Sequence, residues 1–82
     1  MNPRVTEVHV MRPYQLALTF ANGERKAFNC EPYLNKGFFV QLKNLEYFNQ
    51  VRVMQSGGTI HWPNGQDFCP DTLYLASENL KE

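Results

Sequence analysis

The feature that most constrains this chain is a stretch with a strict period of two that runs directly into a tight-turn signal. In residues 14–20, YQLALTF, large apolar side chains occupy every second position, which places them on one face of a β-strand. Asn22-Gly23 follows and offers the positive φ angles that a tight hairpin needs. Residues 25–30 should therefore return antiparallel. Because residues 4–11 also alternate, the first third of the chain is predicted to be a three-stranded meander.

The period of two is lost in residues 31–50. Large apolar residues recur there at steps of three and four, which favours one or two short helices with a shared inner face. Gly37 is suited to opening this segment and Asn44 to capping its last turn. The positions predicted to face inward are Phe38, Phe39, Leu42, Leu45 and Phe48.

The last third of the chain returns to strands and then ends in a helix. Residues 51–55 and 59–62 are predicted strands, joined by a turn that is rich in glycine. The sequence Pro63-Asn64-Gly65 predicts a bulged hairpin into residues 66–68. Pro70 suits the first turn of a helix and Asp71 complements its positive end, so residues 70–77 are expected to be helical.

Together these patterns predict an α+β fold. It consists of two antiparallel β-meanders, about six short strands in one sheet or two abutting sheets, with a short helical segment over residues 38–49 between them and a short C-terminal helix. With 82 residues, the chain (1–82) is expected to form a single small domain whose final residues, 78–82, are free to fray.

Composition narrows the class of function. Eight Lys and Arg balance eight Asp and Glu, which is unusual for a protein whose main task is to hold phosphate groups. The chain has neither a signal-peptide core nor an apolar run of about 20 residues, so we expect a cytoplasmic protein with no membrane partner. Cys30 and Cys69 lack metal or redox spacing and are predicted to be free thiols.

Two groups of residues are candidates for chemistry. His61, Asp67 and Asp71 are the candidate metal ligands, but their spacing matches no zinc or calcium motif. Cys69 precedes the predicted helix, where a thiolate is stabilised, and His9 or His61 is the candidate base. Structural roles are expected instead, with His61 in solvent, Asp71 supporting the helix and Cys69 buried or capping. We therefore predict no catalytic residue, no metal and no cofactor.

The stretches HWPNGQDFCPDTLY (residues 61–74) and LTFANGERKAF (residues 18–28), with the spacing of Leu42, Phe48 and Val51, resemble the small bacterial family named domain of unknown function 2442. The resemblance runs from about residue 5 to residue 74 and implies a compact α+β domain. Many members are encoded beside a second small protein, in arrangements similar to toxin–antitoxin pairs. The family usually has Asp at the position of Asn22, and either residue suits the turn.

We expect a non-catalytic protein-interaction module, the antitoxin-like or accessory partner of a small protein encoded nearby; a homodimer is compatible with this role. The predicted surface combines an exposed strand edge with the turn at residues 64–71. The candidate partner-binding residues are Trp62, Asn64, Asp67 and Asp71. Two of them have structural alternatives: Trp62 as a core residue, and Asp67 as an acceptor for backbone N–H groups of the turn or the helix start.

The alternative function is a nucleic-acid-binding regulatory component of the same module. It rests on positive charge and an aromatic ring on the first meander, from Arg4, Arg12, Arg25, Lys26 and Tyr14. A small-ligand-binding or enzymatic domain is the third interpretation. It requires a concave pocket that collects His61, Asp67 and Cys69.

Overall fold

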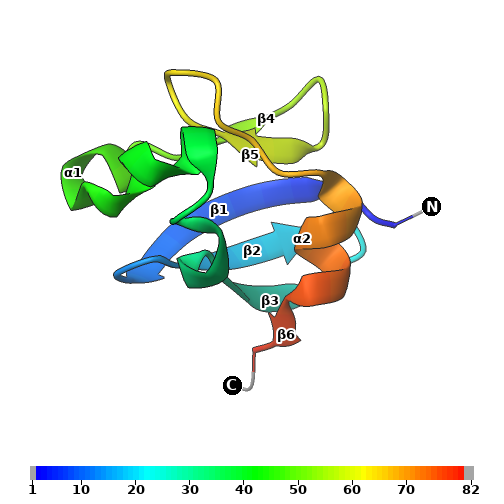
Figure 1. The fold of residues 1–82 in the computed structure, drawn as a ribbon. Helices are drawn as coiled ribbons and strands as arrows, with labels where there is room; N and C mark the ends of the chain where they lie inside the picture. Colours follow the sequence, from blue (N-terminus) through cyan, green and yellow to red (C-terminus); the bar gives the residue numbers. More distant parts are fainter. Residues whose placement is uncertain (1, 81–82) are drawn as a thin grey trace.

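The larger sheet is built from the predicted meander. The structure, a computed structural model, describes residues 2–80. In it β1 (Val5–Arg12), β2 (Gln15–Phe20) and β3 (Arg25–Asn29) are antiparallel neighbours (Figure 1). The alternating residues of β2 are buried on one face, and the β2–β3 turn closes through Gly23, whose φ is +90°. The meander prediction is confirmed.

A bulge sets the phase of β1. Val5 lies opposite Phe20 and Glu7 opposite Thr19, so two steps along β1 match one step along β2. The extra residue shifts the alternation of side chains, and Val8 therefore packs against the same core as Val5.

The second sheet is a hairpin of β4 (Arg52–Met54) and β5 (Thr59–His61). The predicted continuation of this sheet through residues 66–68 differs from the structure, in which an isolated bridge pairs His61 with Asp67. The Thr59 hydroxyl donates to the Phe68 carbonyl at 2.5 Å. At this position a side-chain hydroxyl, and not a backbone N–H of a strand, is therefore the donor to Phe68.

The sixth strand lies at the edge of the larger sheet. β6 (Glu78–Asn79) pairs with Lys26 and Ala27 of β3, and this gives the order β1-β2-β3-β6. It occupies part of the segment expected to fray, of which residues 81–82 lie outside the described part of the chain. The fold class is confirmed: six short strands in antiparallel sheets, a helical segment in the middle and a C-terminal helix.

The middle segment is helical, mostly as 3-10 helix. η1 (Glu31–Tyr33) is followed by η2 (Gly37–Lys43) and by one turn of α-helix, α1 (Leu45–Phe48). Asn44 caps α1 as predicted, because its side-chain oxygen accepts from the backbone N–H groups of Glu46 and Tyr47 at 3.0 and 3.4 Å.

The prediction that all five large apolar residues of this segment face inward is wrong for two of them. Leu42 and Phe48 are buried, but Phe38 is 60% exposed and Leu45 41% exposed. A 3-10 helix has three residues per turn, so Phe38 shares its outer face with Gln41. Leu45 is the first residue of α1 and follows Asn44, whose backbone is extended. This break between the two helices points the Leu45 side chain away from the buried face that contains Leu42.

The C-terminal helix α2 (Pro70–Ala76) packs against the ends of β2 and β3 (Figure 1). Leu73 is fully buried, and the Tyr74 ring meets Phe20 edge-on at 5.1 Å. The Tyr74 hydroxyl bonds to Glu24, and the Lys26 ammonium donates to the Tyr74 carbonyl at 3.1 Å. These contacts fasten α2 to the β2–β3 hairpin. Within residues 2–80, no helix has the length and apolar character needed to cross a membrane.

The two sheets and the helical segment share one aromatic core. Phe68 lies between its contributors: its ring centroid is 5.0 Å from that of Phe28, 4.9 Å from Phe39 and 6.0 Å from Trp62. Within the described residues, every buried side-chain nitrogen and oxygen has a hydrogen-bond partner. No polar group is therefore left unpaired in this core, and candidate functional groups are sought on the surface.

Candidate interaction surface

The turn at residues 63–65 is fixed from below by Trp62. Its backbone N–H donates to Gln66 and its carbonyl accepts from Gly65, both at 2.9 Å, and Gly65 takes a φ of +99°. The ring is 1% exposed and its indole N–H donates to the Phe48 carbonyl at 2.9 Å. Trp62 is a core residue, so it supports the turn and has no surface of its own to offer a partner.

Gln66 links this turn to η2 and α1, a role that the sequence analysis missed. Its side chain is 1% exposed and accepts from the Tyr47 hydroxyl at 2.5 Å. Its amide donates to the Phe38 carbonyl at 3.1 Å and to Gln41 at 3.0 Å. The sequence does contain a signal for this role. Gln66 lies two residues before Phe68 in a predicted strand, so both side chains are expected to point to the same, inner face.

Above this network lies a surface formed by Phe38, Gln41, Asn64 and Gly65, which we call the turn surface. The Asn64 side chain donates to Gln41 at 2.8 Å, and its backbone N–H donates to the Tyr47 hydroxyl at 2.8 Å. A side-chain carbon built on Gly65 would lie 3.8 Å from the Phe38 ring. The exposed Phe38 ring therefore lies beside a turn whose backbone is fixed by hydrogen bonds.

Asp67 lies near the turn surface but stands apart from these bonds. It is exposed, and its carboxylate takes part in no hydrogen bond or ion pair among the described residues. The interpretation of Asp67 as an acceptor for the turn or for the helix start therefore has no support in the structure.

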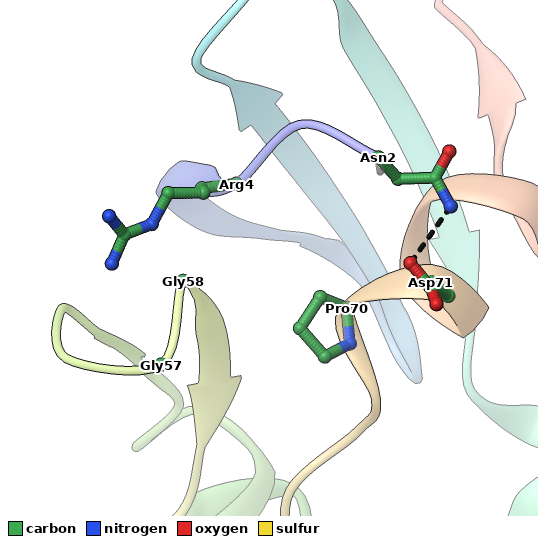
Figure 2. Close-up of a pocket in the computed structure, with 6 residues that line it drawn as sticks. All are labelled: Asn2, Arg4, Gly57, Gly58, Pro70 and Asp71. Carbon is green, nitrogen blue, oxygen red and sulfur yellow. Dashed lines mark hydrogen bonds between the residues drawn. The ribbon is translucent and has the colours of Figure 1, made fainter.

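Asp71 belongs to a different place, at the start of α2. A hollow of about 340 Å³ opens there, lined by Asn2, Arg4, Gly57, Gly58, Pro70 and Asp71 (Figure 2). Asp71 accepts from the Asn2 amide at 2.9 Å. Arg4 extends away from Asp71 across the glycine turn and donates to the Gln55 carbonyl at 2.9 Å. The four predicted binding residues are therefore not one surface: Asn64 lies on the turn surface, Asp67 nearby, and Asp71 at this hollow.

The isolated bridge places His61 and Asp67 opposite each other, but the candidate chemical groups do not assemble into a larger set. No group of three or more His, Cys, Asp or Glu within residues 2–80 is placed to hold a metal ion, so His61, Asp67 and Asp71 do not form a ligand set. Five hollows on the described residues, with volumes of about 210 to 410 Å³, have no lining from His61, Asp67 or Cys69. Burial raises the pKa of the Cys30 thiol to about 12, which leaves it protonated and unreactive. Cys69 is exposed.

Part of the predicted basic face is used inside the fold. The Lys26 ammonium lies 4.2 Å from the centre of the Tyr74 ring, in addition to its bond to that residue's carbonyl. The Tyr14 hydroxyl donates to the Lys43 carbonyl at 2.6 Å, and its ring packs edge-on against Phe48 at 5.6 Å. Both side chains are half-buried and make these contacts within the fold.

Comparison with known proteins agrees with the resemblance seen in the sequence. The family model described as a protein of unknown function (DUF2442) matches residues 5–79. No curated protein and no solved structure matches the chain. The family match covers every strand and helix described above, and it carries no reaction or ligand with it.

Proposed function

The chain belongs to the DUF2442 family of proteins of unknown function, and we propose that it is a non-catalytic protein-interaction module. The observation that carries this proposal is the Phe38 ring, which is 60% exposed on a small domain whose core contains Phe20, Phe28, Phe48 and Phe68. Large aromatic side chains held at the surface are the residues that most often dominate binding between proteins.

The support beneath Phe38 strengthens the proposal. Its carbonyl accepts from the buried Gln66 amide, and its ring stands beside Gly65. A side chain presented by a fixed backbone loses little conformational freedom on binding, so more of its contact energy appears as affinity. Asn64 adds a polar group to the turn surface through its bond to Gln41. The exposed carboxylate of Asp67, which follows Gln66 in the chain, is suited to an Arg or Lys of the partner.

We place the partner in the same genetic module. Resemblance to a family whose genes often lie beside a second small gene supports an antitoxin-like or accessory role toward the neighbouring protein. The proposal names no reaction for the chain itself, and a homodimer through the same surface is a second assembly that it allows.

The proposal is tested with the purified chain and the protein encoded next to it. We expect the two to co-purify and to give a saturable calorimetric isotherm. The substitution Phe38→Ala should weaken binding by at least about tenfold, as loss of a central aromatic contact does. Leu75→Ala is the matched control, because Leu75 is 72% exposed on α2, away from the turn surface. No binding by the wild-type chain, or equal losses in both variants, contradicts the proposal.

A nucleic-acid-binding role in the same module is the second candidate. The observation in its favour is that Arg12 and Arg52 are exposed and that their guanidinium groups form no hydrogen bond or ion pair among the described residues. Binding through such residues should weaken steeply between low and moderate salt in a DNA titration. Absent or salt-independent binding would exclude this role.

A further inference from the structure

A hollow of about 270 Å³ is bordered by the β1–β2 turn and by both 3-10 helices. Tyr14 lines it from the turn, and Lys43 lines it from the end of η2. The remaining lining residues belong to η1 or directly follow it; they are Glu31, Leu34 and Asn35. We call this site the Tyr14 hollow. It shares no residue with the turn surface.

The polar side chains of the Tyr14 hollow, apart from the Tyr14 hydroxyl, have no partner within the described chain. Glu31, Asn35 and Lys43 are exposed, and their side chains form no hydrogen bond or ion pair among residues 2–80. In the hollow beside α2, by contrast, each polar side chain is bonded within the protein. The Tyr14 hollow therefore offers a carboxylate, an ammonium and an amide to a ligand.

The two charged groups have opposite signs. Glu31 and Lys43 line one hollow, yet no ion pair joins them in the part of the chain that the structure describes. A purely anionic ligand would be attracted by Lys43 and repelled by Glu31, and a purely cationic ligand would meet the reverse. A ligand with both an ammonium and a carboxylate pairs favourably with each residue. The charges therefore favour a small zwitterion.

The backbone of the hollow is fixed on both of its charged sides. The Glu31 N–H donates to the Asn29 side chain at 3.1 Å, and the Glu31 carbonyl accepts from the Leu34 N–H at 3.2 Å. On the other side, the Tyr14 hydroxyl donates to the Lys43 carbonyl at 2.6 Å. A site whose backbone is held before binding loses less conformational freedom when the ligand arrives.

The hollow also has an apolar wall. Leu34 is buried, Tyr14 is half-buried, and both pack in the hydrophobic core. A volume of about 270 Å³ is smaller than the roughly 300–1,000 Å³ of sites that hold drug-sized molecules, so the ligand must be smaller than those. An acid, a base and an apolar wall match the three parts of an amino acid.

We infer that the Tyr14 hollow binds a free α-amino acid with an apolar side chain. Glu31 pairs with the ammonium of the ligand and Lys43 with its carboxylate, while Leu34 and the Tyr14 ring contact its side chain. The inference goes beyond the proposed function, because it concerns a small ligand and uses no residue of the turn surface.

The test is an NMR titration of the full, nitrogen-15-labelled chain with L-leucine. Saturable shifts are expected for backbone amides around the hollow, with a dissociation constant below about 10 mM. Three comparison ligands each lack one feature: N-acetyl-L-leucine lacks the ammonium, L-leucinamide lacks the carboxylate and free glycine lacks the apolar side chain. Each should bind about tenfold more weakly than L-leucine.

Matched protein variants connect each charge of the ligand to one residue. Glu31→Gln should weaken L-leucine about tenfold and should remove the difference between L-leucine and N-acetyl-L-leucine. Lys43→Gln should weaken L-leucine about tenfold and should remove the difference between L-leucine and L-leucinamide. Glu46→Gln and Lys36→Gln make the same changes at exposed residues outside the hollow and should leave binding within about twofold. The amide spectrum verifies that each variant is folded.

Four results would overturn the inference. They are no saturable shift with L-leucine up to about 100 mM, shifts that map away from the hollow, equal effects of the variants inside and outside it, or ligand differences that persist in both Glu31→Gln and Lys43→Gln. Binding of the neighbouring protein through Phe38 is measured separately, so failure of the proposed function leaves this inference standing, and the reverse also holds.

Discussion

Gln66 is a buried polar side chain that connects three parts of the chain. Through its one amide it joins the turn to Tyr47 of α1 and to Phe38 and Gln41 of η2. Inside a protein such a group contributes stability only while its partners are in place, because an unpaired buried donor or acceptor loses its hydration without replacement.

Replacing Gln66 with leucine should therefore destabilise the fold by about 1–3 kcal/mol, since the Tyr47 hydroxyl and the Phe38 carbonyl both lose a partner. Urea unfolding measures the change. Gln50→Leu is the control: Gln50 is exposed, and its variant should stay within about 0.5 kcal/mol of the wild-type chain. Equal stabilities for the two variants would remove Gln66 from this role.

The turn between β4 and β5 contains two adjacent glycines with different constraints. Gly58 has a φ of +66°, and a side-chain carbon there would lie 2.8 Å from the Arg4 Nε and 3.0 Å from its Cβ. At Gly57 the nearest atom to such a carbon is the Met54 sulfur at 3.2 Å, at the flexible end of a side chain.

Gly58→Ala should cost at least about 1–2 kcal/mol, from the left-handed backbone and from displacement of Arg4. Gly57→Ala, one residue away, should cost clearly less because Met54 can move. Thermal unfolding of the two variants under the same conditions measures the difference in stability. A larger loss of stability in Gly57→Ala than in Gly58→Ala would contradict this description of the turn.

At the scale of elements, α2 is held on the sheet by a bond that depends on pH. Hydrogen bonds from Tyr74 and then from Asn22 lower the pKa of Glu24 below its ordinary 4.5. The same bond to Glu24 raises the pKa of Tyr74 above 10. A lowered carboxyl pKa contributes stability that is present above about pH 4.5 and is lost as the pH falls through the folded pKa.

Removing the hydroxyl should remove this dependence. Tyr74→Phe should be less stable than the wild-type chain near neutral pH, and the difference should shrink as the solution is acidified below pH 4.5. Urea midpoints across the acid range measure it, together with an NMR titration in which the Glu24 pKa moves up in the variant. Tyr33→Phe, which leaves Glu24 untouched, should not move that pKa; a shift there of equal size would refute the assignment.

At the scale of the whole molecule, the two sheets share one core. The Phe68 ring meets Phe28 of the larger sheet and Trp62 beside the smaller one. With no second core to hold either sheet alone, the small domain should lose both sheets together.

The chain should therefore unfold in a single transition. Trp62 fluorescence reports the turn and the smaller sheet, whereas far-ultraviolet circular dichroism reports all elements. The two curves should coincide in urea, with the same midpoint and slope. An earlier fluorescence transition would show that the β4–β5 hairpin opens independently of the larger sheet.

Much of the architecture could be read from local patterns in the sequence. The alternation in β2, the Asn22-Gly23 turn, the Asn44 cap and the Pro70 helix start each depend on residues close in the chain, so propensity and steric limits specify them directly. Burial of Trp62 followed from its size in a small domain.

The surfaces depended on contacts between residues far apart in the sequence. The period of the 3-10 helix η2 exposes Phe38, and the fold of the turn onto it joins Gln66 and Asn64 to Gln41. The meeting of Asp71 with Asn2, 69 positions apart, and of β1 with β4, likewise follows from tertiary packing. Local sequence determines which strands and turns form; only the packing of the two sheets around one core decides which side chains remain outside to bind.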